Sequence, residues 1–227
     1  MHIPDGFVDF KTAVTTSAFT LSGFIYSIFK VKQYFRAKVI VIMGVFAALI
    51  FAAQMINFTI LGGTSGHLLG GALAAITLGP FAGSIIITAV LVIQAFIFGD
   101  GGIFALGANG FNMAIIGVFG AYFFYWLIKR ISKRKIVFYS AVAFSSWISV
   151  VLASFFAALE LGISGIYSFG LTLQSMVYIH MIIGLGEAAI TTFIIFFIDR
   201  IRPELILTKN WENKPAAAEV ENKITTG

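Results

Sequence analysis

The amino-acid sequence predicts an all-α integral membrane protein with about seven transmembrane helices, each of which needs about 20 apolar residues. Hydrophobic residues make up 59% of the 227 residues, not counting 23 glycines, and charged residues only 11%, less than half the roughly 25% usual in soluble domains. From Val39 to Ile128 there is no Lys or Arg, and Asp100 is the only carboxylate, which excludes a soluble domain. The segments 39–53 and 84–98 lack the alternating polarity of a transmembrane barrel.

Three clusters of positive charge predict how the chain crosses the membrane. Because cytoplasmic loops are enriched in Lys and Arg, each cluster is placed in the cytoplasm, and an even number of spans must separate successive clusters. The sequence Gly79-Pro80-Phe81 divides the apolar stretch 66–98 into two short spans, which gives four crossings between the first two clusters. The N-terminus is then outside and the C-terminus cytoplasmic. The clusters are Lys30, Lys32, Arg36 and Lys38; Lys129, Arg130, Lys133, Arg134 and Lys135; and Arg200, Arg202 and Lys209.

The predicted spans form one polytopic membrane domain over residues 1–202, followed by a polar cytoplasmic tail over 203–227. The tail is rich in Ala, Glu and Lys and has no apolar face, which favours a frayed segment. The spans lie near residues 8–29, 38–57, 66–79, 82–98, 109–128, 136–158 and 172–198.

The absence of cysteine restricts the chemistry of any site. With no cysteine in the sequence, a disulfide, a thiolate metal site and a cysteine nucleophile are excluded, and a metal must bind through nitrogen or oxygen. The sequence also lacks a glycine-rich phosphate loop ending in Gly-Lys-Ser/Thr, so the chain cannot hydrolyse ATP by itself. The net charge of +5 is explained by membrane topology and does not indicate a nucleic acid partner.

The first two residues, Met1 and His2, bring three nitrogen donors together. The Met1 amine, the His2 amide and His2 Nδ1 can bind one metal ion in fused five- and six-membered rings, and such in-plane nitrogen sets suit Ni(II) or Cu(II). His67 lies at the outer start of the predicted span 66–79, on the same side as the N-terminus, and is the predicted fourth ligand. The alternatives are that an N-terminal His occurs by accident and that His67 caps backbone groups.

Two further ionisable residues, His180 and Glu187, lie in the last predicted span. With Gly184 they follow the i, i+4, i+7 spacing of one helix face. They are interpreted as either a hydrogen-bonded polar pair that joins helices or functional coupling residues, since ionisable groups within a membrane are costly and often functional.

Several ordered blocks of the sequence form a recognisable pattern, namely residues 1–7, 54–58, 62–71, 99–102, 106–109 and 112–113. These blocks resemble the CbiM/NikM family, the substrate-specific components of cobalt and nickel energy-coupling-factor (ECF) transporters. The resemblance implies seven helices in a prokaryotic cytoplasmic membrane, with the N-terminus inserted into the molecule from outside. It implies a divalent ion held by the Met1 amine, the His2 amide and imidazole, and His67, the set that the chelate geometry suggests independently. It also implies a transmembrane coupling subunit, cytoplasmic ATPase subunits and a small accessory membrane protein as partners.

Two groups of residues fit this role. Gly44, Ala48 and Ala52 form a small-residue stripe for either internal packing or docking of the coupling subunit. The second group consists of polar residues near the predicted outer ends of the spans, which either orient the imidazoles or join and cap helices. Within it, Asp100 attracts the cation or caps a turn. The second group contains Gln54, Asn57, Thr64, Ser65, Asp100, Asn109 and Asn112.

The sequence therefore predicts a non-enzymatic membrane subunit that captures Ni(II) or Co(II) outside for ATP-driven uptake, with no resident cofactor. Three alternatives remain open. The first is an ion channel with His180 and Glu187 as a pore-lining relay. The second is a vitamin-binding subunit of the same transporter class, which would need an aromatic-lined pocket. The third is an intramembrane hydrolase using His67 and Asp100, which the absence of an HExxH motif disfavours.

Overall fold

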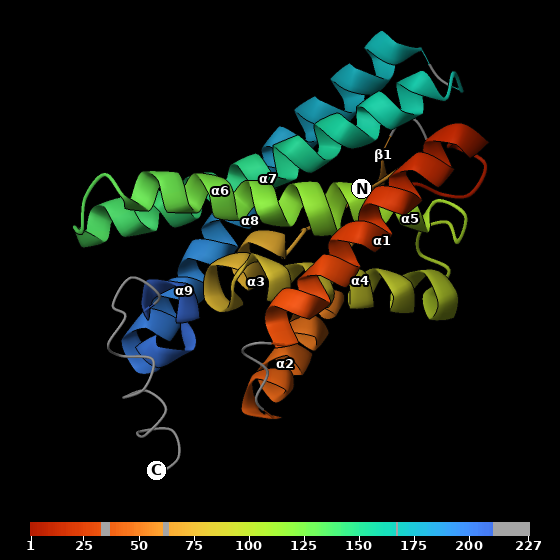
Figure 1. The fold of residues 1–227 in the computed structure, drawn as a ribbon. Helices are drawn as coiled ribbons and strands as arrows, with labels where there is room; N and C mark the ends of the chain where they lie inside the picture. Colours follow the sequence, from red (N-terminus) through yellow and green to blue (C-terminus); the bar gives the residue numbers. More distant parts are fainter. Residues whose placement is uncertain (33–36, 61–63, 167, 211–227) are drawn as a thin grey trace.

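A computed structural model describes residues 1–32, 37–60, 64–166 and 168–210. Arg36, Gly62, Gly63 and residues 211–227 of the predicted tail lie outside the described residues, as does the side chain of Lys38. The chain folds into a bundle of helices with one short β-hairpin (Figure 1).

The helices follow the apolar segments of the sequence closely. π-Helical turns follow α4 and connect α5 with α6. The hairpin lies between α2 and α3. The elements are α1 (Phe10–Lys32), α2 (Ala37–Gln54), β1 (Phe58–Ile60), β2 (Thr64–Gly66), α3 (Gly71–Leu78), α4 (Pro80–Ile93), η1 (Gln94–Phe98), α5 (Leu106–Gly110), η2 (Phe111–Gly117), α6 (Val118–Lys129), α7 (Lys135–Ile163), α8 (Phe169–Ile201), η3 (Pro203–Leu205) and α9 (Leu207–Asn210).

Most of the predicted spans are confirmed. Within the described ranges, five helices are long and apolar enough to cross a membrane, namely α1, α4 with η1, α5 through α6, α7 and α8. Helix α2 is a shorter apolar helix over the same segment as the predicted span 38–57. The antiparallel pairing of β1 with β2, in which Thr59 lies opposite Ser65, was not predicted.

The predicted helical span over 66–79 is wrong in its first half. Only Gly71–Leu78 is helical, a length of about 12 Å compared with the roughly 30 Å hydrocarbon core of a bilayer. Residues 67–70 run from β2 to α3 without helical structure. Glycines at 66, 70 and 71 interrupt the segment, and Gly70 adopts a positive φ of 73° that ends regular structure there.

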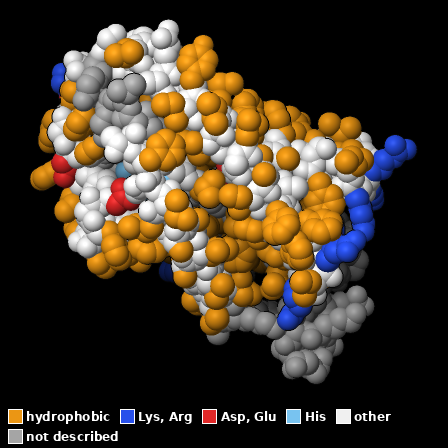
Figure 2. Space-filling model, turned by 180° about the vertical axis from the view of Figure 1, so that it is seen from behind, with side chains coloured by type: hydrophobic (Ala, Val, Ile, Leu, Met, Phe, Trp, Pro, Cys, Tyr) orange, Lys and Arg blue, Asp and Glu red, His pale blue; other side chains and the backbone are white. Residues whose placement is uncertain are grey.

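Helix α3 lies at the centre of the bundle, where all of its residues are buried. It packs against α4, α6 and α7, and α7 and α8 form a long antiparallel pair (Figure 1). The outer surface carries many exposed large hydrophobic side chains (Figure 2), which is the surface that lipid requires. Most Lys and Arg side chains visible in Figure 2 gather at one end, away from the acidic and His side chains. This separation agrees with the topology predicted from the charge clusters.

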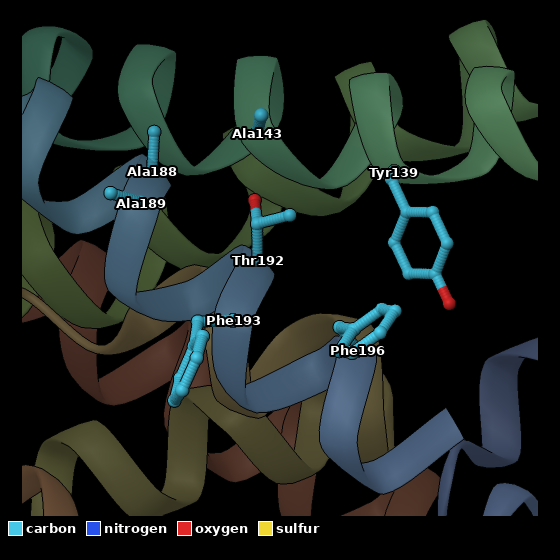
Figure 3. A pocket seen from close by; sticks show the side chains of 7 residues that line it. All are labelled: Tyr139, Ala143, Ala188, Ala189, Thr192, Phe193 and Phe196. Carbon is cyan, nitrogen blue, oxygen red and sulfur yellow. The ribbon is translucent and has the colours of Figure 1, made fainter. Parts of the chain in front are cut away.

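A hollow of about 440 Å³ lies between α7 and α8 (Figure 3). Its lining is almost entirely apolar, with Ala143 and Ala188 on facing helices and Phe193 and Phe196 at its edge. Ala188 lies more than two helical turns beyond His180 along α8. The hollow therefore belongs to the lipid-facing groove between these two helices and not to the region of the His residues.

Candidate metal site

The N-terminal segment enters the bundle and is held there by Asn109 of α5. Met1 and Ile3 are completely buried and His2 is 3% exposed, and the N-terminus lies within the molecule beside β1 and α5 (Figure 1). The Ile3 amide donates to Asn109 Oδ1 at 2.8 Å, and Asn109 Nδ2 donates to the Ile3 carbonyl at 3.0 Å. The Gly102 amide donates to the same carbonyl at 2.9 Å. Asn109, a predicted site residue, therefore fixes the chain directly after His2.

A second anchor, Asp5, was not identified from the sequence. Its carboxylate accepts hydrogen bonds from the amides of Ile103 (3.0 Å), Phe104 (2.8 Å) and Ala105 (3.1 Å). These amides directly precede α5, where a negative charge is favoured by the helix dipole. The available signal was the sequence Pro4-Asp5-Gly6, because Asp before Gly is typical of a turn, and Gly6 has a φ of 86°.

Three nitrogen atoms converge on the hydroxyl of Ser65 in β2. Ser65 Oγ lies 3.0 Å from the Met1 amine, 3.1 Å from the His2 amide nitrogen and 3.5 Å from His2 Nδ1. His2 Nδ1 also lies 3.1 Å from Asp100 Oδ1, and Asn57 Nδ2 donates to Asp100 Oδ2 at 2.8 Å. The three predicted donors of the chelate thus face one point, with an oriented carboxylate beside them.

The imidazole of His67 stacks on that of His2, with ring centroids 4.3 Å apart and planes inclined by 22°. His67 Nδ1 lies 2.7 Å from the Leu68 carbonyl, which requires the hydrogen to be on Nδ1 and leaves a lone pair on Nε2. His67 Nε2 is buried and has no hydrogen-bond partner within the described part of the chain. This arrangement, with one ring nitrogen bonded to a carbonyl, leaves Nε2 able to bind a metal.

Burial and Asp100 determine the charge of the site. Burial lowers the pKa of the Met1 amine well below its ordinary value, and Asp100 offsets this only in part. Burial also lowers the pKa of the His2 imidazole, although the hydrogen bond that His2 donates to Asp100 opposes this shift. Burial would raise the pKa of Asp100, but its hydrogen bonds and the neighbouring charges hold that pKa below its ordinary value. Burial thus favours the neutral forms of the Met1 amine and the His2 imidazole, beside a carboxylate whose charged form is favoured.

A hollow of about 460 Å³ lies beside the site. It is lined by His2 and Asp100 together with polar and glycine residues such as Asn57, Ser65 and Gly101. Its described lining contains no Phe, Tyr or Trp, in contrast to the aromatic pocket expected of a vitamin-binding subunit.

Comparison with known proteins gives the family. Residues 2–205 match the family model CbiM, described as the cobalt uptake substrate-specific transmembrane region. The chain belongs to the CbiM family. A putative fused nickel transport protein NikMN from Archaeoglobus fulgidus is 43% identical over 227 residues, covering 99% of this chain and 74% of that protein. A cobalt transport protein CbiM from Thermosediminibacter oceani is 34% identical over 149 residues, covering 63% of this chain and 60% of that protein.

Solved structures agree with this membership in the CbiM family. A crystal structure of a transition metal transporter has a TM-score of 0.85 and 33% sequence identity, covering 93% of this chain and 99% of the solved chain. A truncated transition metal transporter has a TM-score of 0.83 and 33% identity, with coverage of 87% and 98%. The chain is thus a substrate-specific, multi-pass membrane component of cobalt/nickel transport, and its relatives are named as transport proteins.

In this CbiM-family chain, some predicted site residues lie away from the three nitrogen donors. Asn112 Nδ2 donates to Glu160 at 2.6 Å, and the Thr64 hydroxyl contacts the sulfur of Met176 at 2.9 Å. Gln54 Nε2 donates to the Leu69 carbonyl at 2.7 Å. These residues join elements around the site, and Gln54 does so on the segment that carries His67.

His180 and Glu187 are both buried, but each bonds to a different part of the backbone. His180 Nδ1 donates to the Met176 carbonyl at 2.7 Å, and Glu187 accepts from the amides of Leu69 and Gly70. The small-residue stripe Gly44, Ala48 and Ala52 is exposed on the outer face of α2. Within the described chain these three residues are therefore not covered by other helices.

Proposed function

We propose that this chain is the substrate-binding membrane subunit of an ECF-type ABC transporter and captures Ni(II) or Co(II) at Met1, His2 and His67. The observation that carries the proposal is the convergence of the Met1 amine, His2 amide and His2 Nδ1 on one point, at 3.0, 3.1 and 3.5 Å from Ser65 Oγ. The free Nε2 of His67, on a ring stacked against His2, supplies the fourth nitrogen. The metal is the transported substrate, and the chain has no cofactor of its own.

The donor set favours a late first-row divalent ion. An amine, a deprotonated amide and two imidazoles are nitrogen donors, and tetragonal nitrogen sites suit Ni(II) and Cu(II), whereas oxygen-rich octahedral sites suit Mg(II) and Ca(II). Binding releases the proton of the His2 amide, and the resulting negative charge, together with the neighbouring Asp100 carboxylate, compensates part of the positive charge of the ion. The names of the relatives, cobalt and nickel transport proteins, support Ni(II) or Co(II) as the substrate.

The proposed partners are a transmembrane coupling subunit, cytoplasmic ATPase subunits and a small accessory membrane protein. The exposed stripe Gly44, Ala48 and Ala52 on α2 supports docking of the coupling subunit, because small residues let two helices approach closely in lipid. A Cβ atom at Gly44 would have open space around it, so a substitution there changes the surface and not the core.

Gly44→Leu should therefore reduce metal uptake by cells about tenfold or more while leaving metal affinity of the purified chain unchanged, because a large side chain on the stripe blocks close helix packing. Uptake of radioactive nickel by cells that express all subunits measures the effect. Val45→Leu, one position off the stripe and also exposed, is the matched control. Equal uptake by Gly44→Leu and Val45→Leu would contradict docking through the stripe.

The proposal is tested by equilibrium binding of Ni(II) and Co(II) to detergent-purified chain with its native start, beside a version with one Gly placed before Met1. The native chain should bind one ion tightly. The extended chain should lose tight binding, because the amine moves away from the His2 amide and the fused rings cannot close. Equal binding by both, or binding by neither, would overturn the ligand assignment.

The alternatives have less support. An ion channel would need His180 and Glu187 to line a water-filled path, but both are buried and bonded to backbone groups. The vitamin-binding alternative lacks its aromatic pocket in the described residues.

A further inference from the structure

The segment 67–70, which carries His67, is non-helical backbone inside the membrane domain. His67 is 2% exposed and Leu69 is completely buried. Backbone N–H and C=O groups at this depth have no water to bond and must be satisfied by protein groups. The position of His67 therefore depends on which side chains supply those bonds.

Glu187 of α8 bonds to two successive amides of this segment. The Leu69 amide donates to Glu187 Oε2 at 2.8 Å, and the Gly70 amide donates to Glu187 Oε1 at 2.7 Å. Both carboxylate oxygens are thus used, and the side chain is 3% exposed. Gly70 precedes α3 and has no side chain with which to cap this helix. The carboxylate of Glu187, from the distant helix α8, takes the place of a local cap. It also faces the positive end of the dipole of α3.

The same peptide segment is held from the opposite side by α2. Gln54 Nε2 donates to the Leu69 carbonyl at 2.7 Å. Gly70 has a φ of 73°, and a Cβ atom there would overlap Ile50 of α2. The backbone two and three residues after His67 is therefore fixed by side chains of both α8 and α2.

We infer that Glu187 is a positioning residue, which holds His67 in register with the N-terminal chelate by fixing the backbone at Leu69 and Gly70. This inference rests on the proposed function and assigns the role of Glu187 within it. His67 can leave the metal only if these two hydrogen bonds break or if the segment moves together with α8. Glu187 does not contact the metal in this role, and it acts only through His67.

The experiment is a double-mutant cycle with Ni(II) as the probe, comparing wild type, Glu187→Gln, His67→Ala and the double variant in detergent. The amide of Gln has the size of the carboxylate but presents an NH₂ group to one of two N–H donors. Glu187→Gln should therefore weaken Ni(II) binding about tenfold to a hundredfold, the range for loss of hydrogen bonds to a charged group. In the His67→Ala background it should cause no further loss, because the residue acts only through His67.

Two controls separate positioning from a general structural role. Glu160→Gln replaces another buried carboxyl group, whose described side-chain partner is Asn112 and not the segment 67–70, and it should leave Ni(II) affinity unchanged. The visible absorption of bound Ni(II) should shift towards that of His67→Ala in Glu187→Gln but not in Glu160→Gln. If Glu187→Gln does not fold, Gln54→Met serves in its place, because it removes the hydrogen bond to the Leu69 carbonyl. It should cause a smaller loss of Ni(II) affinity, and no loss in the His67→Ala background.

The possible results are distinguishable. Lack of Ni(II) binding by the wild-type chain would overturn the proposed function and this inference together. Tight wild-type binding that Glu187→Gln does not weaken would overturn the inference alone. An equal loss in the presence and absence of His67 would also overturn it, because it would mean that Glu187 acts on the whole fold.

Discussion

His2→Ala is expected to abolish tight binding of Ni(II) and Co(II), with a loss of affinity of more than about a hundredfold. Loss of an outer partner of a metal ligand costs about tenfold to a hundredfold, and this substitution removes the ligand itself. It opens the six-membered ring of the chelate and removes the ring that stacks on His67 at 4.3 Å. Isothermal titration of the purified chain with each metal measures the effect.

The control for this substitution is His180→Gln. His180 is also a completely buried imidazole, but its described hydrogen bond is to the Met176 carbonyl, so affinity should stay within about threefold of wild type. Wild-type affinity in His2→Ala would contradict the chelate and favour the ion channel, whose conduction depends on His180 and Glu187 and not on His2.

Gly102→Ala is expected to weaken the binding of Ni(II) and Co(II) about as much as His2→Ala does, although Gly102 is not itself a proposed metal ligand. A Cβ atom at Gly102 would overlap the carboxylate and the backbone nitrogen of Asp5. Because the Gly102 amide also bonds to the Ile3 carbonyl, the N-terminal segment cannot remain seated beside an alanine. The Met1 amine and His2 would then leave Ser65 and His67, and affinity should fall more than about a hundredfold. The same titration, with a thermal unfolding curve, measures the effect.

Gly170→Ala on α8 is the matched control, since its Cβ atom would meet nothing within 4 Å, and it should bind metal as wild type does. If Gly102→Ala bound metal with unchanged affinity, seating of the N-terminal segment against the 99–105 loop would not be required for the site. A loss of binding accompanied by complete unfolding would point to the fold and not to the seating of the segment.

The sequence determined the membrane class and most spans, and it also predicts the N-terminal chelate. Low charge and long apolar segments require a membrane environment for the chain. This requirement can be predicted from composition alone, because it does not depend on which residues contact each other. The Met1 amine, His2 amide and His2 imidazole belong to neighbouring residues, so covalent geometry alone brings three donors together. His67 was predicted as the fourth ligand because the chain has only three His residues and the predicted topology placed His67 on the same side of the membrane as the N-terminus.

Only the tertiary structure decided how His67, the proposed fourth ligand, and the N-terminus are held. Hydropathy predicted a helical span over 66–79, but the structure has no helix over residues 67–70, where Glu187 and Gln54 bond to the backbone of Leu69 and Gly70. Glu187 lies 118 residues from Leu69 along the chain, and Asp5 bonds to amides nearly a hundred residues away. A hydrogen bond between such distant residues depends on how the helices pack, which no local pattern of residues records.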